Sequence, residues 1–144
     1  MRGFRRPSIF LRAGTIVPKR WCWPIVTISV WILKLSSSFG GGMGRLREVC
    51  GAVTGMFALA GLQYPAADPS DSLARSTNYG KVQELAAQFK SEMGSYICAE
   101  LLQIRREPQE PVPSERTKLY YNLRPCTRCV ATAARIFGED IFKG

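Results

Sequence analysis

The sequence predicts an all-α fold, a small bundle of about four to five helices in residues 36–144. Apolar residues recur at helical spacing in two long stretches, and no stretch of useful length after residue 35 alternates between apolar and polar residues as a strand would. The composition, 46% hydrophobic and 22% charged over 144 residues, is ordinary for one soluble domain with a modest core.

Two longer helices are expected in the first half of this domain. Residues 36–44 are rich in serine and glycine, and we interpret them as a flexible entry to a helix over about residues 46–62. A turn-rich loop at 64–71 precedes a second helix at about 78–93. Its apolar stripe comprises Val82, Leu85, Ala86, Phe89 and Met93. Gly94 and Ser95 mark a break, after which a shorter helix begins near Ile97.

Prolines divide the second half. Three of them fall within residues 107–114, so this stretch is expected to be an exposed linker. A short helix is predicted from Ser114, a plausible N-cap, to about Tyr121. Pro125 suits the first turn of a last helix that runs to about Phe137.

The first 35 residues do not share this pattern. Nine of the 20 basic residues precede Glu48 and no acidic residue does, which leaves eleven basic and eleven acidic residues in the remainder. The chain from Glu48 onward is therefore neutral, and this argues against a nucleic-acid partner for the folded domain. The apolar run from Trp21 to Leu33 is too short to span a bilayer. We interpret residues 1–35 as a disordered or artefactual extension, with a targeting or membrane-surface segment as the alternative.

The cysteines are the main candidates for catalysis or metal binding in this chain. The chain has five cysteines and no histidine, which removes Ser-His-Asp catalysis, Cys-His catalysis and mixed Cys/His zinc sites. Cys126 is the strongest candidate, because a thiol in the first turn of a helix, between Arg124 and Arg128, is expected to form a thiolate readily. Cys126 and Cys129 also form a CxxC, but no βαβ pattern surrounds it, so a thioredoxin fold is not expected.

Two other cysteines lie on predicted helices. Cys50 is followed by Gly51 and Gly55, and glycine beside a thiol leaves room for a partner sulfur, a substrate or a metal to approach. Cys98 lies on the inner face of its short helix. Taken alone, each is more often a small buried hydrophobic residue than a functional thiol. Arg45 and Arg47 could help to stabilise a Cys50 thiolate, but a surface position is the safer expectation for both.

The residues resemble one family. The run from Ser36 to Arg45, continuing into Val49–Gly55, is similar to the glycine-to-cysteine block of the bacterial and archaeal C_GCAxxG_C_C family. The segments Ile97–Leu102 and Arg124–Cys126 resemble its later cysteine blocks. The resemblance covers about residues 35–137 and implies a small all-helical protein with four characteristic cysteines that act in redox or metal chemistry. Members often occur near transporter genes, which implies a link to a membrane transporter.

One block of the family pattern is missing. The family's first cysteine lies in an N-terminal helix, in a context resembling Asn-Cys-Ala-Gln, and nothing similar precedes Ser36. Cys22 is flanked by Trp21 and Trp23 and does not match. Cys129 is an addition to the pattern that could partly substitute for the missing thiol.

Three functional hypotheses follow. The first is a cytoplasmic thiol oxidoreductase with reversible disulfide chemistry. In it, Cys50, Cys98 and Cys126 converge and act on an unidentified redox partner. The supporting residues would be Gly51, Gly55, Arg124, Pro125 and Cys129. The second is a module that binds a metal or an iron–sulfur cluster through Cys50, Cys98, Cys126 and Cys129 or Cys22. The third is a non-catalytic protein that associates with a membrane or a partner through residues 1–35.

Overall fold

A computed structural model describes residues 30–142 of the chain. The backbone separates into two units, residues 1–34 and 35–144. In the first unit only residues 30–34 are described, and they are helical. The predictions for Cys22 and for residues 1–29 therefore fall outside the described residues. No helix within 30–142 is long and apolar enough to cross a membrane.

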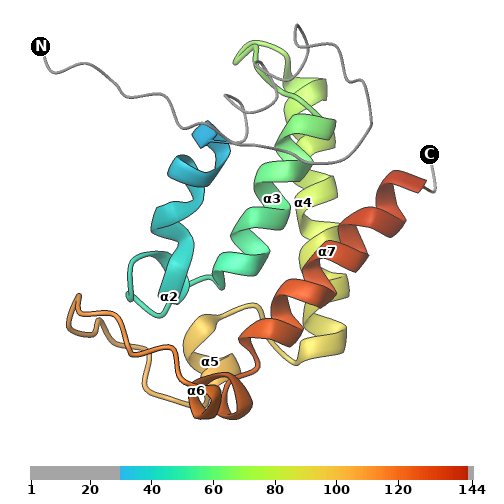
Figure 1. Cartoon of the computed structure of the whole chain (residues 1–144). Coiled ribbons are helices and arrows are strands. Elements are labelled where there is room, and N and C mark those ends of the chain that lie inside the picture. Colours follow the sequence, from blue (N-terminus) through green and yellow to red (C-terminus); the bar gives the residue numbers. More distant parts are fainter. Residues whose placement is uncertain (1–29, 143–144) are drawn as a thin grey trace, which may run out of the picture. The chain divides into compact units, whose positions relative to one another are not determined.

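The predicted all-α fold is confirmed. Three helices, α3 (Gly51–Gln63), α4 (Ser72–Met93) and α7 (Cys126–Phe142), pack against one another in pairs (Figure 1). Shorter elements accompany them: η1 (Ser37–Phe39), α2 (Gly40–Met43), α5 (Cys98–Leu102) and α6 (Lys118–Leu123). The described part of the chain contains no strand, and Val49 and Ile97 form only an isolated antiparallel bridge.

The core lies between the three long helices. Its buried members are Val53, Met56 and Ala60 of α3, Leu85 and Phe89 of α4, and Cys129, Ala133 and Ile136 of α7. The apolar stripe predicted for α4 supplies two of these residues, and its Val82 and Met93 pack against the same core. Burying such side chains is the main favourable term in folding a domain of this size. One thiol of the CxxC is thus a core residue.

Helix α3 begins later than the sequence pattern predicts. The predicted start was near residue 46, but the helix begins at Gly51 and Cys50 is its N-cap. The preceding residues pair with a distant segment instead. The Cys50 N–H donates to the Tyr96 carbonyl at 2.9 Å, and the Cys98 N–H donates to the Glu48 carbonyl at 2.7 Å. This pairing holds Cys50 and Cys98 on two neighbouring chain segments.

Three further helix boundaries also differ from prediction. Helix α4 begins at Ser72, because Asp71 caps it by accepting the Ala74 N–H at 2.9 Å. Thr117, not Ser114, is the N-cap of α6, where it accepts the Tyr120 N–H. Helix α7 continues to Phe142, five residues past its predicted end. The exposed linker at 107–114 is confirmed.

The glycine-rich entry is a tightly packed structure, and our prediction of a flexible loop was wrong. A Cβ built at Gly42 would lie 2.6 Å from the Cβ of Cys98, and one at Gly51 would lie 2.4 Å from the Phe39 carbonyl oxygen. Both positions therefore need glycine. A Cβ at Gly55 would meet nothing within 4 Å, so no neighbouring group requires glycine there. The backbone also has positive φ at five successive residues, Gly41, Gly42, Met43, Gly44 and Arg45.

Candidate functional site

Four thiols lie at one end of the bundle. Cys50 precedes the first turn of α3, Cys98 begins α5, Cys126 begins α7, and Cys129 lies one turn further along α7. Cys50 packs against the core cluster that contains Cys129, and α3 and α7 begin at the same end of the bundle (Figure 1). The amino termini of both helices, which carry partial positive charge, therefore face the thiols.

Cys50 packs against the core cluster that contains Cys129, and the two thiols are close enough for each to shift the pKa of the other. This interaction is the main reason that the pKa of Cys50 falls to about 6 and that of Cys129 rises. No side-chain capping hydrogen bond forms at the start of α3, but the N–H groups of Ala52 and Val53 face the sulfur and lower its pKa further. Cys129 is 2% exposed and burial also raises its pKa. The helix amino terminus beside Cys50 and the burial of Cys129 therefore favour Cys50 as the member of the pair that ionises first.

Cys98 is buried beside an arginine. The Arg47 Nη1 lies 3.8 Å from the Cys98 Sγ. Burial raises the pKa of Cys98, and the Arg47 hydrogen bond and charge oppose that rise. Negative charge on Cys50 or Cys126 raises the pKa of Cys98 as well, so these three thiols are close enough to interact electrostatically.

Cys126 is the exposed member of the set. It is the first residue of α7, and the carbonyl of Pro125 accepts the Cys129 N–H at 2.8 Å, the first bond of the helix. Pro125 therefore lies just before the helix rather than inside its first turn. Arg124 ends α6 and lies over the Tyr120 ring, 4.5 Å from its centroid. The positive charge of Arg128 acts on Cys129 and partly offsets the rise in the pKa of that thiol.

The described side chains do not form a ready metal site. Within residues 30–142, no group of three or more histidine, cysteine, aspartate or glutamate side chains is arranged to hold a metal ion. The predicted ligands Cys50, Cys98, Cys126 and Cys129 are free cysteines here. The donor set does not fit a metal in this arrangement, and no chemical step is assigned to one.

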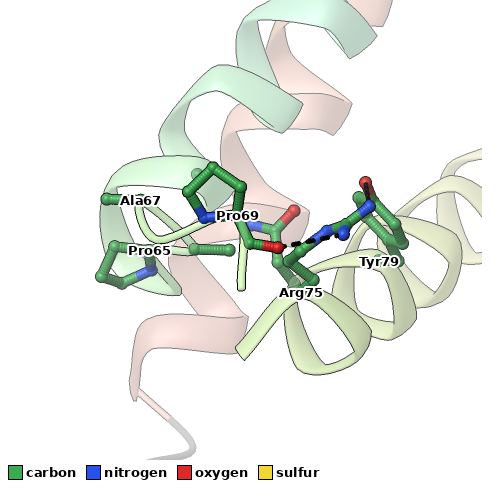
Figure 2. A pocket seen from close by; sticks show the side chains of 8 residues that line it. Pro65, Ala67, Pro69, Arg75 and Tyr79 are labelled. Carbon is green, nitrogen blue, oxygen red and sulfur yellow. Dashed lines mark hydrogen bonds between the residues drawn. The ribbon is translucent and has the colours of Figure 1, made fainter. Parts of the chain in front are cut away.

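Two hollows lie on the described surface. A hollow of about 220 Å³ between α3 and α7 is next to the thiols and is lined by small and apolar residues, among them Gly51, Gly55 and Val130. A larger one, about 610 Å³, lies at the far end of α3 and is lined by prolines and alanines (Figure 2). There Arg75 donates to the Pro69 carbonyl and to the Tyr79 hydroxyl. Because α3 is 13 residues long, this second hollow lies about 20 Å from Cys50.

Sequence reasoning missed two residues of the site. Arg47 was expected on the surface near Cys50, but it is 2% exposed and contacts Cys98. Gln109 was placed in an exposed linker, yet its side chain accepts a hydrogen bond from Arg47. No local pattern marks either residue, because both contacts join segments more than 50 residues apart.

The fold and its thiols define a class: small all-helical proteins with several cysteines at one end of the bundle. A family model described as "Putative redox-active protein (C_GCAxxG_C_C)" matches residues 27–139. The match covers most of the chain, which therefore belongs to this family. It begins eight residues before the limit expected from the sequence and ends two residues after it. No curated protein and no solved structure matches the chain.

Proposed function

We propose that this protein is a thiol–disulfide oxidoreductase in which Cys50 and Cys129 form a reversible disulfide. The observation that carries the proposal is the packing of Cys50 against the buried cluster that contains Cys129, near enough for the two thiols to interact. Disulfide exchange needs a thiolate and a neighbouring sulfur, and Cys50 supplies the thiolate at neutral pH. Membership of a family described as redox-active supports the same class of function.

The chemistry balances with a disulfide as oxidant. The Cys50 thiolate attacks one sulfur of an oxidised partner, protein or low-molecular-weight, and forms a mixed disulfide while the partner's first thiolate leaves and takes up a proton. Cys129 then loses its proton and attacks the Cys50 sulfur, and the partner's second thiolate leaves. The partner has gained two electrons and two protons, and this chain holds a Cys50–Cys129 disulfide.

Access to this pair is narrow. Cys50 is half-buried and Cys129 is buried, whereas Cys126 is exposed and the hollow between α3 and α7 lies beside Cys50. An extended segment or a small disulfide fits such an approach better than a bulky surface. We assign Cys126 to the surface where the partner docks before Cys50 attacks it. Cys126 and Cys129 are three residues apart, so Cys126 lies one helical turn from the buried Cys129 thiol.

Disulfide mapping tests the proposal. The protein is equilibrated in glutathione buffers of graded potential, free thiols are blocked, and linked peptides are identified by mass spectrometry. We expect two thiols to disappear together and the Cys50–Cys129 linkage to form, in the Cys98→Ser variant as well as in the wild type. A constant free-thiol count over the whole range, or oxidation that joins other cysteines while Cys50 and Cys129 stay reduced, would refute the pair.

A further inference from the structure

A buried arginine next to a thiol has no role in the chemistry described so far. Arg47 is 2% exposed and has φ of +65°, a conformation that side-chain-bearing residues rarely adopt. Its carbonyl accepts the Ala99 N–H, and its own N–H donates to the Gly41 carbonyl. The backbone on both sides of the arginine is therefore fixed, and the guanidinium is held inside the domain.

The guanidinium has neutral partners only. Its Nη1 contacts the Cys98 Sγ, its Nη2 donates to the Gln109 Oε1, and its Nε is buried without a hydrogen-bond partner. No carboxylate of residues 30–142 lies within ion-pair distance of it, and no acidic residue precedes Glu48 in the sequence. Arg45 also donates to Gln109, so two cations share one amide oxygen.

A buried cation is strongly disfavoured unless an opposite charge accompanies it. Of the groups in contact with Arg47, only the Cys98 thiol can become an anion. We infer that Arg47 is the electrostatic partner of a Cys98 thiolate and allows Cys98 to act as a second thiol that can ionise inside the domain. Arg47 acts through Cys98 and is a positioning residue, not a catalytic one.

The order in which the thiols ionise then follows, and this step rests on the proposed function. Burial keeps Cys98 protonated at rest, and the charges of Cys50 and Cys126 also raise its pKa. A Cys50–Cys129 disulfide removes the negative charge of Cys50 and leaves the attraction of Arg47 in place. Cys98 therefore becomes a better nucleophile once Cys50 is oxidised, and it can then attack the Cys50 sulfur and release Cys129 as a thiol.

Gln109 allows the inference to be tested without removing Arg47. In the Gln109→Glu variant, a carboxylate would replace the amide oxygen that Arg47 and Arg45 share. The new anion would take over as the counter-ion of Arg47 and oppose ionisation of Cys98. The backbone N–H of residue 109 donates to the Arg45 carbonyl in either case, so the position of the segment is kept.

The measurement is the ionisation midpoint of Cys98 in the reduced protein, followed by the Cβ chemical shift of ¹³C-labelled cysteine. We expect Gln109→Glu to raise this midpoint by about one pH unit or more, and the exposed control Gln83→Glu to leave it unchanged. Arg47→Lys should stay nearer to the wild type than Arg47→Met does. Equal midpoints in the wild type and Gln109→Glu would overturn the inference.

Folding and function can be separated in this experiment. If Arg47→Met loses its helical circular dichroism, Gln109→Glu alone decides the result. Because the protein stays reduced throughout, the ionisation midpoint of Cys98 measures the influence of Arg47 on that thiol even if no Cys50–Cys129 disulfide ever forms. If the protein is fully redox-active but the Cys98 midpoint is the same in Gln109→Glu, Arg47→Met and the wild type, the role of Arg47 is rejected and the proposed function is retained.

Discussion

Replacing Gly42 with alanine should weaken the fold at the thiol cluster. The residue has φ of +64°, where an L side chain costs about 1–2 kcal/mol. The added Cβ would also lie 2.6 Å from the Cys98 Cβ and 3.0 Å from the backbone of Glu48, and overpacking of this kind costs about 1–3 kcal/mol. We therefore expect Gly42→Ala to lower the free energy of unfolding by about 2–5 kcal/mol, a large share of the stability of a small domain.

Gly44 provides the matched control. Its φ is +62°, but a Cβ there would meet nothing within 4 Å, so Gly44→Ala should cost only the backbone term, about 1–2 kcal/mol. Urea unfolding of both variants, analysed with a common slope, gives the difference that belongs to the contact. That difference should shrink in a Cys98→Gly background, which removes the opposing Cβ, and persist in Cys98→Ala, which keeps it. Equal destabilisation by the two alanines would refute the packing argument.

The remaining predictions concern pH, the core and the far end of the bundle. The pKa of Cys50 is about 6 in the folded chain and about 8.5 when unfolded, so the free energy of unfolding should increase as pH rises from 6 to 8.5. This extra stability is lost as pH falls through 6. In Cys50→Ser, the urea midpoint should not change with pH over this range. Phe89→Ala should cost about 3–5 kcal/mol in the same assay, whereas Phe142→Ala, 91% exposed, should cost under about 0.5. Asp140→Asn removes the buried carboxylate that binds Lys81 at 2.9 Å and should cost about 2 kcal/mol by thermal unfolding.

The local parts of this fold could be predicted from sequence. The apolar period of α4 and the prolines of the linker both identified their elements. The start of α4 was missed because residues 72–77 carry no apolar period, and a single side chain, Asp71, sets that boundary. Helix boundaries depend on such individual caps more than on the pattern that follows them.

The non-local parts could not be predicted. The apolar residues Val49 and Cys50 fit a helical period, so the helix was extended back to residue 46; in fact Val49 pairs with Ile97. The expectation that the cysteines approach one another came from the family resemblance. The packing of Cys50 against the cluster that contains Cys129 was not expected from it. The burial of Arg47 depends on backbone with positive φ and on a contact 51 residues away, and neither is visible in composition or periodicity.

The two hydrogen bonds that join the backbone of Cys50 to Tyr96 and that of Cys98 to Glu48 close the α3–α4 hairpin at its base. The segments 48–50 and 96–98 cannot part while these bonds hold, so separating Cys50 from Cys98 requires that both break. Their amide protons should therefore exchange with solvent deuterium together, in one local opening event. The exchange rate of these two amides would report how often the segments that carry Cys50 and Cys98 separate, independently of any oxidant.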